Sequence, residues 1–210
     1  MYMPRHFEET RPEVLHELVR SHPLGLLITQ DADAGLSANP VPFLLEHDEA
    51  GRAVLRAHVA RANPVWQAAR RDVESLVVFQ GPQAYVSPGW YATKAEHGKV
   101  VPTWNYVAVH AYGSAEFFED ADRLLDVVTR LTALYEGPRE KAWQVSDAPA
   151  DFIKAQLRGI VGFRMPITRI DAKKKMSQNR KLEDRAGVIA GLDASDRPSD
   201  REVAAMIPTT

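Results

Sequence analysis

Apolar residues recur first at helical spacing and then in short runs, so the pattern predicts one helix followed by strands. The apolar positions of 11–21 lie on one helix face, Pro12 suits the first turn, and Thr10 and Glu13 have capping-box spacing. Apolar runs of strand length follow at 24–30, 37–46 and 53–59. Turn residues separate these runs, as is typical of strands joined by tight turns.

Apolar runs of strand length, separated by turn residues, also predict the later strands. They lie at 75–80, 84–87, 104–118 and 159–170. Gly81 and Pro82 are expected to separate the strand at 75–80 from the strand at 84–87. Residues 92–99 are expected to form a polar loop. Earlier in the chain, Pro40 and Pro42 confine part of their strand to an edge or a bulge, because proline cannot donate to a ladder.

The period becomes helical from Asp120 onward. A broad apolar face runs to about 136, where Gly137 and Pro138 stop the helix. Further helices are predicted at 150–157, 185–192 and 201–207. The early strands follow one another without intervening helices, which favours an antiparallel sheet or barrel. The predicted class is α+β, mainly β, with peripheral helices.

The composition is that of a globular protein with one core. Of 210 residues, 45% are hydrophobic and 26% are charged, values that suit a domain able to bury a sizeable interior. We expect a single domain over 1–210, with 172–210 forming a C-terminal tail that contributes to the site.

The absence of cysteine and the small net charge exclude several kinds of functional site. The chain has no cysteine, which excludes disulfides, thiol nucleophiles, thiolate-bound zinc and iron–sulfur clusters. It shows neither a signal-peptide core nor the roughly 20 apolar residues that span a bilayer, so a soluble, cytoplasmic protein is expected. The net charge of -2 gives no general attraction to nucleic acid or membrane.

The stretch 79–110 combines aromatic rings with polar groups and turn residues. Within it, the run VPTWNY at 101–106 brings an indole, an amide and a phenol together. Aromatic faces beside a few directional polar groups are what a pocket for a flat, polar-edged ligand requires. The alternative is ordinary aromatic packing in strands, where tyrosine and tryptophan are favoured.

A candidate anion site follows the third strand. Asn63 is a plausible N-cap and Pro64 suits the first helical position, while Arg61 could bind an anion through two N–H groups. Free N–H groups at a helix start favour a phosphate. The alternative is a surface arginine beside an ordinary cap.

Several catalytic motifs are missing from the sequence. It contains no G-x-G-x-x-G, no Walker loop, no H-E-x-x-H and no G-x-S-x-G. The remaining pattern favours binding of an aromatic, anionic cofactor over acid–base or metal chemistry.

Blocks distributed over nearly the whole chain resemble the PaiB family. They are MYMPRHF at 1–7, HVARANPVW at 58–66, FQGPQAYVSPGWY at 79–91, VPTWNY at 101–106 with His110, and KMSQNR at 175–180. The resemblance implies an FMN-binding split β-barrel related in fold to pyridoxamine-phosphate oxidases and flavin reductases. It also implies a homodimer with flavin at or near the interface, and it brings the label of negative transcriptional regulator.

The resemblance also suggests which residues bind the cofactor. His58, Arg61 and Asn63 would hold the phosphate, with Arg61 and Asn63 the best candidates. Trp104 and Asn105 would face the ring system. The polar contacts closing from the tail would be Lys175, Ser177, Gln178 and Asn179. Val65 stands where the family's Asn-Pro-Gln-Trp version has glutamine. Whether one phosphate or ribityl contact is therefore missing stays open at this point.

Three functions remain open from the sequence. The first is a flavin-dependent oxidoreductase on a small substrate, with an indirect effect on transcription. In this case the cofactor supplies the redox chemistry and no catalytic residue is assigned, although His110 or Tyr106 could donate a proton. The second is a DNA-binding repressor using the basic segment Lys173–Lys181, in a chain without a helix-turn-helix pattern. The third is a haem-binding or haem-degrading split barrel with His58 or His110 as the ligand.

Overall fold

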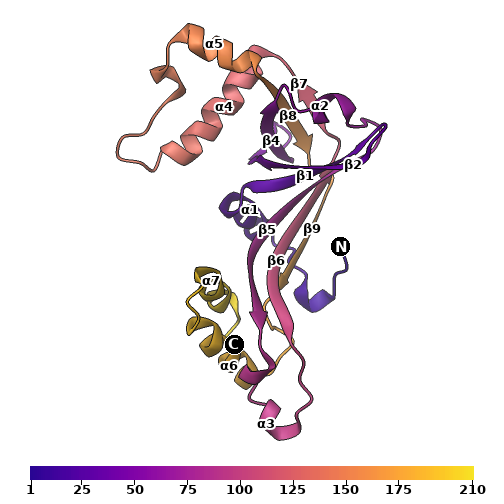
Figure 1. Ribbon diagram of the computed structural model, residues 1–210, viewed down its shortest axis with the longest axis vertical. Helices are drawn as coiled ribbons and strands as arrows, with labels where there is room; N and C mark the ends of the chain where they lie inside the picture. Colours follow the sequence, from indigo (N-terminus) through magenta and orange to yellow (C-terminus); the bar gives the residue numbers. More distant parts are fainter. The chain divides into compact units, whose positions relative to one another are not determined.

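The computed structural model describes residues 1–210 and contains two antiparallel sheets (Figure 1). The strand orders are β2-β1-β5-β6-β9 and β3-β4-β8-β7. The strands are β1 Leu24–Asp31, β2 Gly35–Pro42, β3 Leu44–His47, β4 Ala53–Ala60, β5 Ser75–Val86, β6 Thr103–Gly113, β7 Glu116–Phe118, β8 Ile160–Pro166 and β9 Arg169–Lys175. The predicted class, α+β and mainly β, is confirmed, and the sheets do not close into a continuous barrel.

Helices connect and flank these strands. The α-helices are α1 Pro12–Ser21, α2 Val65–Ala68, α3 Lys94–His97, α4 Ala121–Glu136, α5 Ala150–Arg158, α6 Leu182–Asp193 and α7 Pro198–Met206. Three short 3-10 turns are η1 Arg5–Phe7, η2 Pro88–Trp90 and η3 Val145–Asp147. No helix is long and apolar enough to cross a membrane.

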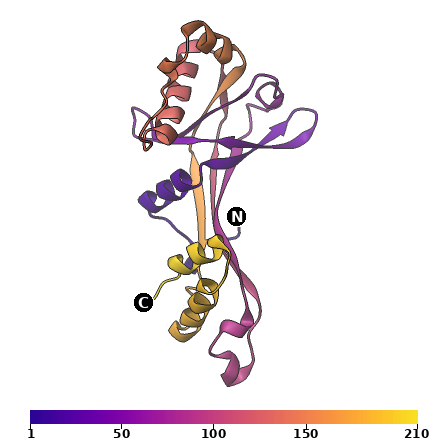
Figure 2. The same cartoon turned by 60° about the vertical axis from the view of Figure 1, so that its left-hand side comes forward.

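The chain groups into two compact units. Unit 1 comprises Met1–Leu18, Gln80–Val109 and Asp171–Thr210, and unit 2 comprises Val19–Phe79 and His110–Ile170. Unit 1 has a core of strand and helix residues, in which α6 and α7 lie side by side (Figures 1 and 2). Unit 2 contains the four-stranded sheet, the β1–β2 hairpin and the helices α4 and α5.

Helix α1 begins where the sequence places it, and the Glu9 side chain binds the backbone just before its first residue, Pro12. The Glu9 carboxylate accepts hydrogen bonds from the backbone N–H groups of Thr10 and Arg11, both at 3.1 Å. It also accepts from the Arg11 guanidinium at 2.9 and 2.6 Å. This side-chain hydrogen bond lowers the pKa of Glu9 to about 2, so the carboxylate stays charged at the helix start, where negative charge is favoured.

Two predicted strands are each divided between the two sheets. The run 37–46 forms β2, at a sheet edge as the prolines require, and β3 in the other sheet. Phe43 lies between them and is buried, and its ring meets Phe79 and Phe163 edge-on at 5.7 and 5.6 Å. The burial of this ring turns the chain from one sheet to the other. The run 104–118 likewise becomes β6, which ends at Gly113, and β7. A Cβ atom at Gly113 would lie 2.1 Å from the Pro166 carbonyl oxygen, so the backbones approach closely where β6 ends.

Other boundaries also differ from the prediction. The break expected at Gly81 and Pro82 is wrong, because β5 runs through both residues; proline has an extended φ and removes only one donor. The polar loop 92–99 contains the single-turn helix α3, and 159–170 contains all of β8 and the start of β9. The helices predicted at 11–21, 120–136, 150–157, 185–192 and 201–207 are confirmed within a few residues.

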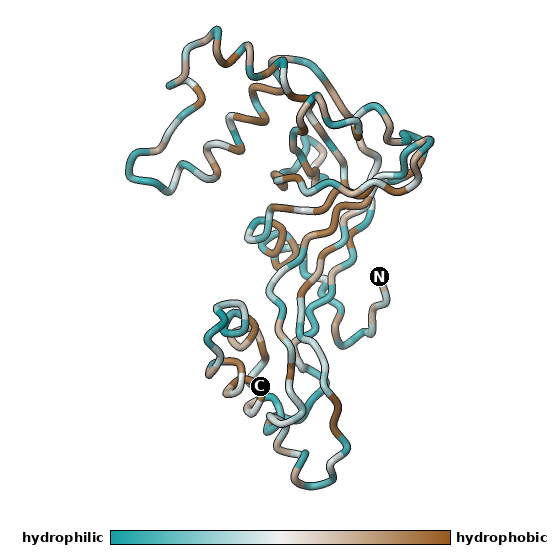
Figure 3. The backbone as a smooth tube through the Cα atoms, in the orientation of Figure 1, coloured by the Kyte–Doolittle hydropathy of each residue, from teal (hydrophilic) through white to brown (hydrophobic).

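Within unit 2, helix α4 is held by apolar contacts and by ion pairs. Its residues Leu124, Val127 and Leu131 are buried against Phe118 and Leu157. Figure 3 shows apolar and polar residues alternating along α4 and a hydrophilic turn after it. One face of the helix is therefore available for the core, as the helical period predicted.

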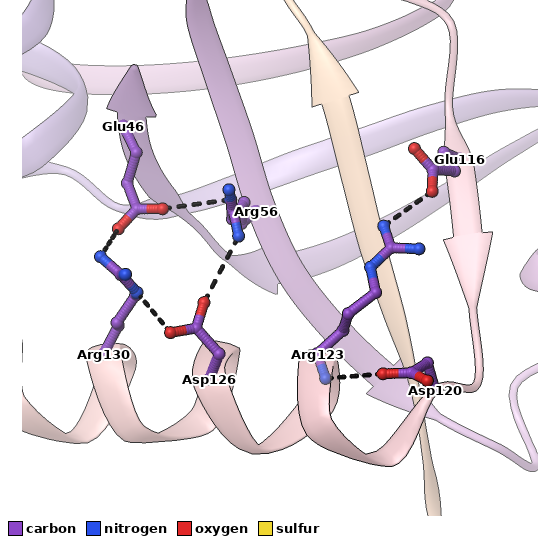
Figure 4. A network of polar contacts seen from close by, with 7 residues as sticks. All are labelled: Glu46, Arg56, Glu116, Asp120, Arg123, Asp126 and Arg130. Carbon is purple, nitrogen blue, oxygen red and sulfur yellow. Dashed lines mark hydrogen bonds and ion pairs between the residues drawn. The ribbon is translucent and has the colours of Figure 1, made fainter. Parts of the chain in front are cut away.

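The polar contacts of α4 form a network in which arginines and carboxylates alternate (Figure 4). Arg56 on β4 contacts Glu46 on β3 at 3.1 Å and Asp126 on α4 at 3.4 Å. Arg130, one turn after Asp126, contacts Asp126 at 2.7 Å and Glu46 at 3.0 Å. Each charge has two partners of opposite sign, and such a shared arrangement holds a helix better than an isolated surface pair.

The start of α4 is held separately, also in Figure 4. The Asp120 side chain accepts a hydrogen bond from the Arg123 backbone N–H at 2.9 Å, which caps the helix. The Arg123 guanidinium then contacts Glu116 on β7 at 2.7 Å. Two contacts therefore hold the first turn of α4: the cap on its backbone and the ion pair to the preceding strand.

In unit 1, α6 approaches the η2 turn closely because it carries glycines on one side. A Cβ atom at Gly187 would lie 2.0 Å from the Trp90 carbonyl oxygen, and one at Gly191 would lie 2.3 Å from the Trp90 ring. Both distances are far below van der Waals contact. The two glycines therefore permit the helix to pack directly on Trp90.

We predict that Gly187→Ala destabilises the protein, although alanine is the better helix former. An exposed helical glycine would gain about 1 kcal/mol from this change, whereas overpacking against a backbone carbonyl costs about 1–3 kcal/mol. Urea unfolding measures the net effect. Ala190→Gly on the exposed side of α6 is the matched control and should cost about 1 kcal/mol. A stabilised Gly187→Ala variant would contradict the close packing.

Candidate functional site

The predicted cofactor residues fall into two groups, one in each unit. Unit 2 contains His58, Arg61 and Asn63, on β4 and in the loop before α2. Unit 1 contains Trp104, Asn105, Lys175, Ser177, Gln178 and Asn179, on β6, at the end of β9 and in the turn that follows.

Unit 1 has a shallow cavity beside Trp104. Its volume is about 250 Å³, and it is lined by Gln80, Gly81, Gln83, Trp104, Tyr106 and Val107. The Trp104 indole is 49% exposed, and its ring meets Tyr85 edge-on at 6.0 Å. The cavity therefore offers an aromatic face together with two side-chain amides, as expected for a flat ligand with a polar edge.

The two glutamines were not among the predicted site residues. Gln80 and Gln83 lie on β5, and both are exposed. Both residues flank Gly81 and Pro82, where the sequence predicted a strand break. Their polarity within an apolar strand was the available signal.

Lys175, the last residue of β9, is a half-buried cation beside the start of β6. Its ammonium donates to the Thr103 hydroxyl at 2.6 Å and to the Trp104 carbonyl. Burial lowers the pKa of Lys175, and the nearby charges of Lys173 and Arg180 lower it further. A cation in this environment would be stabilised by an anionic ligand.

Asn105 and Ser177 lie close together but inside the protein. Asn105 is completely buried, and its amide donates to the Ser177 Oγ at 3.0 Å, while that hydroxyl donates back to the Asn105 Oδ1 at 3.2 Å. Ser177 has a φ of 59°, which is unfavourable for a residue with a Cβ. The buried pair therefore holds the turn after β9 against β6, at the cost of local strain.

The last two predicted residues of unit 1 differ in their roles. The Gln178 side chain accepts from the Met176 backbone N–H at 2.6 Å and donates to the Lys174 carbonyl, so it stabilises its own turn. Asn179 is exposed and makes no polar contact. Of this pair, Asn179 has the side chain that is available to a ligand.

In unit 2, Arg61 already has several partners. Its guanidinium donates to the carbonyl oxygens of Arg158 at 2.6 Å and Ile160 at 3.2 Å, and it forms an ion pair with Glu119. It also lies 5.9 Å from the centre of the Trp66 ring. A phosphate would compete with Glu119 for this arginine, so phosphate binding there stays a prediction.

The N-cap of the short helix α2 is Pro64 and not the predicted Asn63, which lies one residue earlier. The Asn63 Oδ1 accepts from the Val65 N–H at 3.0 Å, and its amide donates to Asn39 at 2.8 Å. His58 projects from β4, and its buried Nδ1 has no hydrogen-bond partner. Burial lowers the pKa of His58, so a neutral imidazole is favoured, with one nitrogen available to a ligand.

The fold and the polar aromatic cavity define a class of flavin-binding split-barrel proteins. Residues 1–169 match the family described as "Putative FMN-binding domain". The protease synthase and sporulation protein PAI 2 of Bacillus subtilis is 32% identical over 208 residues, covering 99% of this chain and 96% of that protein. An uncharacterized protein of Emericella nidulans is 33% identical, covering 92% of this chain and 90% of that protein.

Solved structures confirm the fold at low sequence identity. The flavocytochrome Anf3 from Azotobacter vinelandii aligns with a TM-score of 0.58 and 13% identity, over 82% of this chain and 72% of that chain. The FAD and heme binding protein from Mycobacterium smegmatis aligns with a TM-score of 0.56 and 16% identity, over 85% and 78%.

The chain belongs to the PaiB family of FMN-binding split-barrel proteins. The residues of this chain fit FMN in two respects. In unit 1, the exposed indole of Trp104 and the amides of Gln80 and Gln83 suit a flat ring with a polar edge. In unit 2, the unpartnered Nδ1 of His58 is a buried polar atom that a ligand could satisfy.

We predict that Ser177→Ala destabilises the protein by about 1–3 kcal/mol, because it leaves the buried amide of Asn105 without its partner. Urea unfolding of this variant, of Asn105→Leu and of the double variant forms a complete cycle. The double variant should cost less than the sum of the single changes. Ser114→Ala, at an exposed serine, is the control and should stay within about 0.5 kcal/mol. Additive costs would show that the two side chains do not interact.

Proposed function

We propose that this protein binds FMN with the flavin ring against Trp104 and acts as a flavin-dependent oxidoreductase on a small substrate. The observation that carries the proposal is the cavity of unit 1, where an exposed indole and two amides line one space. Membership in an FMN-binding family supports the choice of ligand.

Each group near the cavity has a chemical role in this proposal. The Trp104 indole supports one face of the ring, and the amides of Gln80 and Gln83 hydrogen-bond its polar edge. The ammonium of Lys175 stabilises negative charge on the ligand, which raises its lowered pKa back toward the ordinary value. The flavin supplies the redox chemistry, while the protein positions it and limits its contact with water.

A second copy of the chain completes the site in this proposal. The cavity, at about 250 Å³, is below the range of about 300–1,000 Å³ that holds most ligands. Unit 2 also has an apolar sheet face without a cover in the single chain. Its residues come from three adjacent strands: Leu24, Leu26 and Ile28 on β1, Leu36, Ala38, Pro40 and Pro42 on β2, and Leu76 and Val78 on β5.

This sheet face suits a homodimer interface. Leu24 and Leu36 expose 65% and 80% of their surface, which is unfavourable for large apolar side chains in a contiguous patch. The cross-strand registers place these residues on the side opposite the buried Leu27 and Val77. Pairing of two such faces would remove both from water.

The repressor alternative needs several exposed cations, because counterion release drives such binding. Within Lys173–Lys181, however, Lys173 is buried and lies 5.3 Å from the centre of the Tyr106 ring. Arg180 lies 4.7 Å from the Tyr91 ring, and Lys181 pairs with Glu183 at 3.4 Å. These contacts favour a structural use of the segment, so any effect of the protein on transcription is proposed to be indirect.

We predict that Trp104→Ala weakens FMN binding about tenfold or more, the scale of losing one ring-on-aromatic stack. Titration of FMN fluorescence and of the visible spectrum measures the change, and Lys175→Met should weaken binding as well. Trp143→Ala is the matched control, because Trp143 is similarly exposed, at 47%, and lies outside this cavity. Equal affinities of the Trp104 and Trp143 variants would refute the ring assignment, and failure of the unchanged protein to bind FMN would refute the proposal.

We predict that Leu24→Lys combined with Leu36→Lys converts a dimer into a monomer. Light scattering should give about twice the chain mass of 23.4 kDa for the unchanged protein and one chain mass for the variant. Both positions are exposed in the single chain, so circular dichroism should show an intact fold. Leu182→Lys, at an exposed leucine of α6, should remain dimeric. A dimeric double variant would place the interface elsewhere.

A further inference from the structure

A larger cavity lies within unit 2, and none of the predicted cofactor residues lines it. Helices α4 and α5 and the loop that joins them enclose about 610 Å³, which is within the range of about 300–1,000 Å³ for small-molecule sites. Its lining includes Leu125, Thr129, Ala133, Trp143, Ile153 and Lys154. None of its residues lines the cavity beside Trp104.

The wall of this cavity is largely apolar and remains partly in contact with water. Leu125 and Trp143 keep 37% and 47% of their surface exposed. Leaving large apolar side chains in water costs about 25 cal/mol for each Å² that could be buried. An apolar occupant would remove this cost, so the cavity is suited to a molecule with a hydrophobic body.

The loop that carries Trp143 is held by its own hydrogen bonds. The Gln144 N–H donates to the Asp147 carboxylate at 2.8 Å, and the Asp147 N–H donates to the Gln144 carbonyl at 2.9 Å. The Trp143 N–H donates to Glu136 at the end of α4 at 3.3 Å. Hydrogen bonds within the wall restrict its conformations, and such preorganisation reduces the entropic cost of binding.

The charged side chains that line the cavity differ in whether they have a partner of opposite charge. The Glu136 carboxylate pairs with Arg139 at 3.2 Å in addition to its backbone donor. Asp122 lies in the first turn of α4, where the helix dipole favours a carboxylate. Lys154 lies in the middle of α5, is exposed and makes neither a hydrogen bond nor an ion pair. Lys154 is thus a cation of the lining that forms no ion pair with the two carboxylates there.

We propose that this cavity binds an apolar carboxylic acid. The hydrophobic body lies against Leu125, Trp143 and Ile153, and the carboxylate lies beside the ammonium of Lys154. The hydroxyl of Thr129, which lines the same space, can hydrogen-bond a carboxylate oxygen. This second site shares no lining residue with the cavity beside Trp104.

Binding is tested with 1-anilinonaphthalene-8-sulfonate, an aromatic anion whose fluorescence rises in apolar surroundings, and with decanoate as a competitor. One probe molecule should bind each chain, and decanoate should displace it. Ala133→Trp fills the space and should abolish both signals. Lys154→Met should weaken both anions about tenfold, as expected for loss of a charged hydrogen bond, and should leave displacement by uncharged decanol unchanged.

Lys141→Met is the matched control, because it removes one exposed lysine near the cavity but outside its lining. It should leave the affinity of both anions unchanged, and circular dichroism with thermal unfolding checks that each variant folds. Unchanged probe binding in Ala133→Trp would overturn the proposal. So would equal weakening by the two lysine variants, or no binding of either anion to the unchanged protein.

Discussion

The two-residue alternation of β6 is the constraint on which the candidate site depends. Asn105 and Val107 point into unit 1 and are buried, so Trp104 and Tyr106 must lie on the opposite face. A slip of one residue would exchange these faces completely. The buried pair of Asn105 with Ser177 opposes such a slip, because it gives the amide a partner only in the observed register. The exposed indole is thus a consequence of a polar contact inside the protein.

The same segment joins the site to the C-terminal part of unit 1. Ser177 requires a left-handed backbone, and the Gln178 side chain closes the turn around it through the Met176 N–H. The strain at Ser177 is maintained by its buried hydrogen bonds. Residues that resemble ligand contacts in the sequence therefore also shape the turn that positions Lys175.

Unit 2 combines two surfaces with different predicted partners. The face of β1, β2 and β5 is apolar and exposed, which suits a second copy of the chain. The space between α4 and α5 is concave and has one unpaired lysine, which suits a small anion with an apolar body. The ion network of Glu46, Arg56, Asp126 and Arg130 holds α4 on its sheet, so the second surface keeps its form.

The sequence by itself determined the class of fold, the main helices and the family, because these depend on local periods and on residue blocks in order. It also indicated Trp104 as a pocket residue. Only the tertiary structure decided that Phe43 turns the chain between two sheets, that β5 passes through Gly81 and Pro82, and that Arg61 pairs with Glu119. Those outcomes depend on contacts between segments far apart in the chain, and a local pattern carries no information about which distant partner a side chain meets.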